Sequence, residues 1–450
     1  MMMKIPEGVG KPFALHGFEK MLYDARQSPV SLVHKDKLYV AWGGSTDGLP
    51  QPNIISYDIP TKTWSEAVRP AKLKREAPDH HMNPVIWMDN QERLHMLFGV
   101  HCSAGTHIYT PEPGNINLWT EGPEIAKDIT YPKIMKTADG TLVMFYRVLA
   151  HMGFWTYITS RDGGFSWTRP VSLIDFDRDP LEGEDDWAST YHNCRMSKDG
   201  KSLHLGFVYF HERGMYNWQH PIYKIAPKVQ TRFDLYYARV NIETGKIYTI
   251  NGDELPRPLN RRMAEPAKIW STYPLLTNIP SLYIDEHDNP GFLLVRSSEE
   301  GMRKCNFWYL QRKDGIWTKT MFANTNSTWA GSCVHKQEDG KLAAYLIASE
   351  ESGEKLTYGG GEVEKWVSDD GTKWSLEGSI IPEPGLIYNN PMFAEKSDGT
   401  GADDRFLLMF GWKGPEGIAT SVGPASYVNG KPPTVVCKGQ AYAAFMGNWI

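Results

Sequence analysis

The sequence has few cysteines, no excess of positive charge and no long hydrophobic run. Its five cysteines are widely spaced, odd in number, and lack CxxC or Cys/His zinc spacing, so we expect no disulfide framework. The formal net charge is −5, which offers no electrostatic footprint for nucleic acid. No segment approaches the roughly 18 apolar residues that a bilayer-spanning helix needs. The composition therefore predicts neither a nucleic-acid partner nor a membrane partner.

Two further absences concern targeting and secondary structure. The first 15 residues contain no apolar h-region, so no signal peptide is expected in this numbering, and a cytoplasmic protein or a trimmed secreted form would both fit. Apolar residues nowhere recur with the helical period of 3.6. Trp (16), Tyr (22), Gly (41) and Pro (30) are instead abundant, which favours many short strands joined by tight turns.

One pattern recurs seven times along the chain. Each copy has a short apolar strand, a polar turn containing Asp or Asn, and a second strand rich in Leu, Val, Phe and Tyr. The copies span residues 31–42, 85–98, 133–146, 194–208, 282–295, 333–346 and 392–410. Internal repeats of this kind, built from strands alone, are typical of β-propellers.

A second signal lies between the copies. Residues 160–167, Ser-Arg-Asp-Gly-Gly-Phe-Ser-Trp, match the Asp-box pattern S-x-D-x-G-x-x-W, and weaker relatives occur at 56–64, 313–317 and 368–374. In such a box Asp162 caps a hairpin turn, glycine takes a positive φ, and Trp167 packs between sheets. The repeats together predict a single all-β domain over residues 1–450: a seven-bladed β-propeller with Asp-box (BNR-like) hairpins and long inserted loops around 210–280.

The repeat also predicts where a functional site lies. The first strand of each blade leaves one face and the second returns to it, so residues before the first strand and after the second share that face. These positions are rich in His, Tyr and Arg and include His81, His101, Tyr131, Tyr146, Arg147, Tyr191, His192, His211 and Arg213, while His220 lies on the long loop that follows. The opposite face receives Asp, Gly and Lys turns. We therefore expect the site on the first face.

This face has few carboxylates, namely Asp79, Glu212 and the acidic segment 182–186. A glycosidase ordinarily needs two positioned carboxyl groups. His, Tyr and Arg suit a different reaction, in which the C5 proton of a uronic acid is removed and the 4-O substituent is eliminated. Arg or protonated His would neutralise the carboxylate, and Tyr or His would accept and return protons. Each positioned proton transfer is typically worth about 10²–10⁴-fold.

The Asp-box propeller, the His81 and His101 pair around one hairpin, and Tyr146 at the end of the next resemble a known family. They are similar to the BNR-repeat seven-bladed propeller polysaccharide lyases, which include short ulvan lyases and L-rhamnose-α-1,4-D-glucuronate lyases. The resemblance covers essentially the whole chain. It implies that His81, His101 and Tyr146 are catalytic and that the substrate is an anionic glycan joining rhamnose to glucuronate or iduronate. Elimination would leave a 4,5-unsaturated uronate.

The resemblance also implies an arginine that binds the uronate, which by family spacing falls near Arg161. The repeat, however, places Arg161 beside the Asp-box turn on the opposite face, so Arg147 and Arg213 are the alternatives that the topology favours. His192, His211 and His220 are further candidates for substrate binding. For every one of these side chains the alternative is a structural role in packing or in surface ion pairs.

The elimination needs no organic cofactor, and a structural metal cation is left open. We expect a monomer. Two other functions stay open at this point. A related branch of the family contains α-L-rhamnosidases, in which histidine would assist water on the same propeller, and a propeller of this kind can also bind carbohydrate without catalysis.

Overall fold

The computed structural model describes most of the chain between residues 22 and 413. The described ranges are 22–44, 51–73, 79, 81–150, 153–176, 187–213, 219–224, 231–349, 360–381 and 386–413. They contain 27 strands and the short 3₁₀ helix η3 (Glu265–Ala267). The prediction of an all-β fold is therefore confirmed. Across these ranges, no helix has the length and apolar character needed to cross a membrane.

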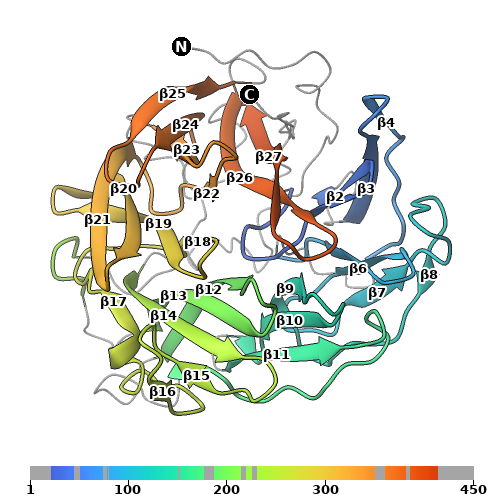
Figure 1. The fold of residues 1–450 in the computed structure, drawn as a ribbon, viewed down its shortest axis with the longest axis horizontal. Helices are drawn as coiled ribbons and strands as arrows, with labels where there is room; N and C mark the ends of the chain where they lie inside the picture. The colour runs from blue at the N-terminus through green and yellow to red at the C-terminus, as the bar shows by residue number, and fades with distance from the viewer. Residues whose placement is uncertain are drawn as a thin grey trace, which may run out of the picture.

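The strands form a ring of small antiparallel sheets, the architecture of a β-propeller (Figure 1). The sheets from the first half of the chain contain β1 (Ser31–His34), β2 (Lys37–Gly44), β3 (Gln51–Asp58) and β4 (Thr63–Trp64); β5 (Val85–Met88), β6 (Leu94–Phe98), β7 (Thr106–Tyr109) and β8 (Thr120–Glu121); and β9 (Thr130–Lys136), β10 (Leu142–Arg147) and β11 (Trp155–Ser160).

The second half of the chain continues around the ring. Its sheets contain β12 (Trp187–Met196), β13 (Ser202–Arg213), β14 (Arg232–Asn241), β15 (Ile247–Tyr248), β16 (Glu254–Leu255) and β17 (Lys268–Trp270); β18 (Ser281–Ile284), β19 (Pro290–Ser298), β20 (Gly301–Lys313) and β21 (Ile316–Thr325); β22 (Ser332–Lys336), β23 (Leu342–Ala348), β24 (Glu362–Ser368) and β25 (Ser375–Ile380); and β26 (Leu386–Lys396) with β27 (Ala402–Lys413). The region 210–280, where we predicted long loops, thus also contains β14 to β17.

The described strands form six hydrogen-bonded sheets, so the prediction of seven separate blades is wrong for this part of the chain. All seven predicted strand pairs are present as antiparallel hairpins. The difference arises because the inner strands of the first and last pairs also bond to each other. β1 and β26 pair in parallel at Leu32–Glu395 and Val33–Lys396. This pairing joins two hairpins into one six-stranded sheet and links the two ends of the described chain.

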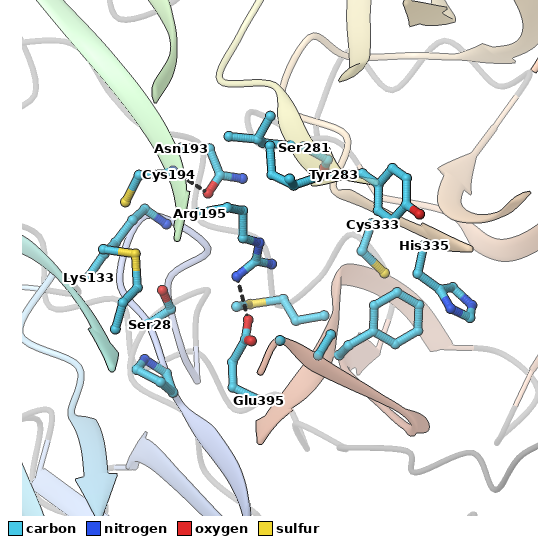
Figure 2. Close-up of a pocket in the computed structure, with 18 of the residues that line it drawn as sticks. Ser28, Lys133, Asn193, Cys194, Arg195, Ser281, Tyr283, Cys333, His335 and Glu395 are labelled. Carbon is cyan, nitrogen blue, oxygen red and sulfur yellow. Dashed lines mark hydrogen bonds and ion pairs between the residues drawn. The ribbon is translucent and has the colours of Figure 1, made fainter. Parts of the chain in front are cut away.

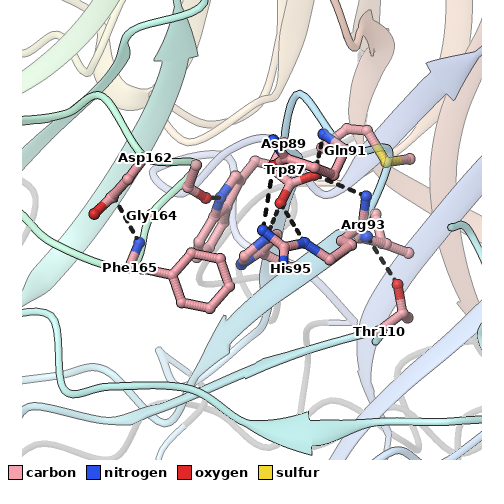
Figure 3. A network of polar contacts seen from close by, with 12 residues as sticks. Trp87, Asp89, Gln91, Arg93, His95, Thr110, Asp162, Gly164 and Phe165 are labelled. Atoms are coloured by element: carbon pink, nitrogen blue, oxygen red, sulfur yellow. Dashed lines mark hydrogen bonds and ion pairs between the residues drawn. The ribbon is translucent and has the colours of Figure 1, made fainter. Parts of the chain in front are cut away.

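The Asp box of residues 160–167 has the structural role predicted for it. Asp162 accepts hydrogen bonds from the backbone N–H groups of Phe165 (3.1 Å) and Ser166 (2.9 Å), and Gly164 has a φ of +107°. The Trp167 indole donates to the carbonyl of Gly164. The Trp87 indole on β5 donates to the carbonyl of Gly163 (Figure 3). The box therefore ties the β9–β11 sheet to the neighbouring β5–β8 sheet.

The turn between β5 and β6 packs against the same Asp box. Asp89 accepts a hydrogen bond from Arg93 Nε (2.7 Å) and lies 3.2 Å from Nε2 of the buried His95 (Figure 3). The Arg93 guanidinium stacks on Phe165 at 4.6 Å. These contacts belong to a turn, and turns of this kind are located at the end of the blades away from the predicted site.

The hydrophobic core lies between adjacent sheets. One cluster, which includes Val85, Leu97, Ile134, Tyr146 and Ile158, fills the space between the β5–β8 and β9–β11 sheets. Burying each such side chain contributes about 1.5–3 kcal/mol, so packing between blades holds the ring closed. The centre of the ring is instead a cavity of about 680 Å³.

Candidate active site

Two histidines from the ends of the β5–β6 hairpin share one carboxylate. His81 precedes β5 and His101 follows β6, and their ring centroids lie 4.3 Å apart. One oxygen of Asp79 lies 2.6 Å from Nδ1 of His81, and the other bonds Nδ1 of His101. A carboxylate only accepts, so each Nδ1 carries the proton and a neutral ring presents a lone pair at Nε2. Asp79 therefore orients both rings as proton acceptors.

Hydrogen bonds from the two histidines keep the Asp79 carboxyl ionised. Burial alone would raise the pKa of this carboxyl, but the hydrogen bonds from His101 and His81 outweigh burial and hold the pKa far below its usual range. The side chains of His81 and His101 are 19% and 21% exposed. The Asp79 side chain is 22% exposed, so these three side chains together form the part of the cluster that is open to solvent.

Two tyrosines lie beside the histidines. The Tyr131 ring, at the start of β9, is 5.7 Å from His81, 5.8 Å from His101 and 5.7 Å from Tyr191 on β12. Tyr131 has a φ of +56°, and the β9–β10 register shifts opposite it, between Phe145 and Arg147. A non-glycine residue in this conformation costs about 1–3 kcal/mol and is often found at functional sites. The bulge directs the ring toward the histidines.

Three arginines surround the two tyrosines. Arg26 Nη1 donates to the Tyr131 hydroxyl (3.1 Å). The Arg147 guanidinium lies 5.0 Å from the Tyr131 ring and 5.3 Å from the Tyr191 ring. The Arg232 guanidinium lies 4.5 Å from the Tyr191 ring. Asp24 accepts hydrogen bonds from Nε and Nη2 of Arg26 and fixes this guanidinium beside Tyr131.

The two phenols have pKa values shifted in opposite directions, and the arginines contribute to this difference. Burial raises the pKa of Tyr131 well above 10, although Arg26 acts in the opposite direction. Burial would also raise the pKa of Tyr191, but the charges of Arg147, Arg232 and Arg26 outweigh it and lower the pKa below its usual value. Pairs of titratable groups whose pKa values are pushed apart are typical of acid–base sites.

Arg147 is the least satisfied member of the cluster. Its side chain is fully buried, and Nε, Nη1 and Nη2 donate no hydrogen bond of standard geometry within the described ranges. Its guanidinium lies over the rings of Tyr131, Tyr191 and Trp155. Burying a charged donor without an acceptor is costly. A ligand with a carboxylate would supply the missing acceptors.

Comparison with known proteins places the fold in a family. Residues 37–325 match the model of the BNR repeat-containing family. The chain belongs to this family.

Individual relatives of this BNR-repeat protein are carbohydrate-active enzymes. An ulvan lyase from Nonlabens ulvanivorans is 24% identical, with 86% of each chain covered. A solved structure described as a polysaccharide lyase PL25 ulvan lyase superimposes with a TM-score of 0.77 at 17% identity, covering 97% of this chain and 95% of the other. A second structure, with a TM-score of 0.76 at 16% identity and the same coverage, is described as bound to -[GlcA(1-4)Rha3S]-. At these identities the structural likeness shows the fold.

Of the side chains predicted from the sequence of this BNR-repeat protein, His81, His101 and Arg147 come together in the cluster. Tyr146 does not join them. It neighbours Arg147 on β10, and adjacent strand residues face opposite sides of a sheet. Arg147 faces Tyr131 and Tyr191, so Tyr146 faces the core cluster against β5–β8, where its hydroxyl is buried with no described hydrogen-bond partner. Its catalytic role stays a prediction that this position does not support.

The other two candidate arginines lie outside the cluster. Arg161 is exposed in the Asp-box turn, close to Asp139 in the β9–β10 turn, which places it on the face away from the histidines. Arg213 is the last residue of β13, and its side chain lies outside the described residues. A uronate-binding role for either residue remains a prediction.

The three remaining histidines occupy packed positions. His192 bonds Thr190 through Nε2 (2.8 Å) and lies 4.5 Å from the Trp155 ring. His211 is buried near the end of β13. His220 donates from Nε2 to the carbonyl of Pro274, and its Nδ1 accepts from two backbone N–H groups of the following turn. Both nitrogens of His220 are thus engaged in folding the loop, and a substrate role for the three residues stays untested.

The sequence analysis missed part of the cluster. Tyr131 and Tyr191 were on the predicted face, but neither received a role. Arg26 precedes β1 by five residues and Arg232 begins β14, a third strand. The repeat predicts the positions next to the ends of the two inner strands, whereas Arg26 lies farther from its strand and Arg232 belongs to an outer strand. Asp79 was noted as a carboxylate of the face, and the signal for its role is the Asp-x-His spacing to His81.

The structure also contains a group of side chains that could bind the structural metal cation left open by the sequence. Asp79, His81 and His101 each offer one ligand atom, and these atoms lie within 4.8 Å of one another. A cation there would have to replace the two protons that Asp79 shares with the histidine Nδ1 atoms. The metal therefore stays a prediction.

Proposed function

We propose that this BNR-repeat protein is a polysaccharide lyase that cleaves a rhamnose–uronic acid linkage by β-elimination. The observation that carries the proposal is the cluster itself: two histidines oriented by Asp79, next to two tyrosines of opposed acidity among three arginines. The relatives named ulvan lyases support the reaction class. The structural neighbour described with a bound glucuronate–rhamnose unit supports the substrate class.

Removal of the C5 proton falls to the histidine pair in this proposal. A neutral His81 or His101 accepts the proton at Nε2, while Asp79 holds Nδ1–H and stabilises the imidazolium that forms. The pair of electrons left at C5 forms the C4–C5 double bond as the C4–O bond breaks. Tyr191, whose pKa is lowered by the arginines, is the second candidate for the base.

Tyr131 is the proton donor to the leaving oxygen. Arg26 donates a hydrogen bond to the Tyr131 oxygen, so the phenolic proton is left to bond another group. Burial keeps the pKa of Tyr131 high, and the phenol therefore retains its proton until the C4–O bond breaks. The products are a new nonreducing end with a 4,5-unsaturated uronate and a chain end with a free hydroxyl.

Arg147 is the candidate for neutralising the uronate carboxylate. Charge builds up on that carboxylate as C5 loses its proton, and a fixed guanidinium stabilises it. Since Arg147 lies beneath the rings of Tyr131 and Tyr191, direct contact requires these rings to part. Without that movement the charge of Arg147 would still act on the tyrosines and on the substrate, because the buried side chains between them have a low dielectric constant.

Hydrolysis fits the cluster less well. An inverting glycosidase needs two carboxyl groups about 6.5–9.5 Å apart, and a retaining enzyme needs them about 5–5.5 Å apart. The described carboxylates of the cluster are Asp79, bound to two histidines, and Asp24, bound to Arg26. Neither is available as acid or nucleophile. The α-L-rhamnosidase and the non-catalytic binding propeller therefore have no specific observation in their favour.

The test uses the purified full chain with ulvan and, separately, with a rhamnose-capped glucuronate glycan such as gum arabic. Ultraviolet absorbance of the 4,5-unsaturated uronate is followed together with free rhamnose. We expect absorbance to rise and the rise to disappear in the His101→Ala variant. Free rhamnose without absorbance would instead identify a hydrolase, and glycan binding without either product would identify a binding propeller.

A further inference from the structure

The cavity at the centre of the ring runs the length of the inner strands. Its lining extends from Arg26 and Trp329, beside the candidate active site, to the turns at residues 197–200 and 396–401 on the opposite face. Asp79, His81 and His101 do not line it. The middle of this cavity, drawn in Figure 2, is therefore continuous with the catalytic cluster at Asp24 and Arg26 but is not lined by the two histidines.

The lining is more basic than the protein as a whole. It contains seven Lys or Arg side chains and five Asp or Glu side chains, whereas the whole chain carries a net charge of −5. A cavity with low-dielectric walls concentrates such a potential. The excess of positive charge favours an anionic occupant.

Lys133 is the one buried lysine among the described residues that line the cavity. It lies on β9, is 4% exposed, and donates from Nζ to the backbone carbonyl of Ala25 (3.1 Å). An ammonium group has three donors, and within the described ranges Lys133 has no other hydrogen-bond acceptor and no ion-pair partner. Burial lowers its pKa to about 8, which is the expected response of an amine that lacks a counterion.

The nearby arginine is already paired. Arg195 on β12 binds Glu395 on β26 through Nη1 and Oε1 at 2.5 Å, and Figure 2 shows this pair. This ion pair uses one of the donors of a planar group that has five. Arg195 can therefore serve a second acceptor while it holds Glu395, and its charge lies close enough to Lys133 to lower the pKa of the amine.

We propose that the middle of the central cavity binds a small oxyanion, held by Lys133 Nζ and Arg195. Sulfate, phosphate and a simple carboxylate share the required chemistry, which is a compact set of acceptor oxygens for an ammonium and a guanidinium. The anion enters from the face of turns opposite the catalytic cluster. The competing occupant is water alone, which would leave the positive charge uncompensated.

Thermal unfolding of the full chain tests the site. Sodium sulfate, phosphate and acetate are titrated separately at pH 7, with sodium chloride holding the ionic strength constant. A bound anion stabilises the native state by mass action, so at least one of the three should give a saturating rise in Tm of about 1–3 °C. Both Lys133→Met and Arg195→Met should abolish the rise, whereas Lys136→Met removes a charge from the same strand and cavity and should preserve it.

A rise that persists in Lys133→Met and Arg195→Met, or no rise beyond that in chloride, would overturn the proposal. If the variants do not fold, crystals of the unmodified protein soaked in selenate give a direct answer. An anomalous peak within hydrogen-bond distance of Lys133 Nζ supports the site. Peaks confined to the outer surface or to the arginines of the catalytic cluster, or none at all, would show that the cavity holds only water. Neither experiment depends on lyase activity.

Discussion

Tyr131 and Tyr146 lie on neighbouring strands and face opposite sides of the same sheet. Tyr131 reaches the histidines and Arg26, whereas Tyr146 is buried between two sheets. We expect Tyr131→Phe to lower kcat by about 10²–10⁴-fold, the usual range for one positioned proton transfer. Tyr146→Phe should leave kcat unchanged, because the hydroxyl that it removes contacts nothing in the cluster.

The second variant also has a stability readout. The Tyr146 hydroxyl is buried without a described partner, so its removal should leave the free energy of unfolding unchanged or raise it by about 1 kcal/mol. Initial rates from the unsaturated-uronate absorbance and urea unfolding of both variants provide the comparison. An inactive Tyr146→Phe beside an active Tyr131→Phe would return the catalytic role to Tyr146.

Asp79 acts on the reaction through the rings that it holds, and is a positioning residue. In Asp79→Asn the amide can accept from only one Nδ1–H, so one imidazole loses its orientation or changes tautomer. We expect kcat to fall by about 10²–10⁴-fold, as when the orienting acid of a histidine base is removed. The pH dependence of kcat should shift as well, because the carboxylate that stabilises an imidazolium is lost. Unchanged kcat and an unchanged pH profile would assign Asp79 a structural role only.

At the scale of the secondary-structure elements, we expect the Asp-box turn to affect the stability of the fold but not catalysis. Asp162 accepts hydrogen bonds from two backbone N–H groups and from the hydroxyls of Ser160 and Ser166. Asp162→Ala should lower the free energy of unfolding by about 1–3 kcal/mol without changing kcat per folded molecule. The neighbouring variant Arg161→Ala is the matched control and should change neither quantity, because its side chain is exposed on the face away from the cluster. A strongly raised KM in Arg161→Ala would instead support the uronate role that the family resemblance implies.

The strand pairs and the histidine pair could be predicted because their signals are local. Alternating side chains and turns define each hairpin, and His81 and His101 flank one hairpin only, so their meeting follows from its geometry. Tyr131 could not be chosen over Tyr146 in the same way. Its position depends on a left-handed backbone and a register shift opposite Arg147, and neither leaves a mark in the sequence pattern.

Pairings between residues far apart in the sequence could not be predicted from the sequence pattern either. The bond between β1 and β26 joins residues more than 360 positions apart, and it changes seven expected blades into six sheets among the described residues. Arg26, in the segment before β1, and Arg232, on β14, reach the same cluster from distant parts of the chain. Periodicity predicts the faces of individual strands, but it does not predict which loops and outer strands meet above the centre of a ring.

At the scale of the whole molecule, buried histidines in separate blades should make the fold sensitive to mild acid. Burial lowers the pKa to about 4 for each of His107, His204 and His335, which lie on β7, β13 and β22. The unfolded chain binds protons at these positions near pH 6.5, whereas the native state does not until about pH 4. Stability is therefore fully present above pH 6.5 and is lost as the pH falls through this window.

The loss between pH 6.5 and 4 can be separated from the behaviour of the carboxylates. Asp24 and Asp89 have pKa values lowered to about 2, so their contribution is lost only at more acidic pH. We expect Tm to fall steadily from pH 7 to pH 5, since each unit of pKa difference corresponds to about 1.4 kcal/mol. His335→Gln should reduce the slope of Tm against pH, whatever its effect on Tm at pH 7. A Tm that is constant over this range, or the same slope in His335→Gln, would show that these histidines keep their protons in the folded protein.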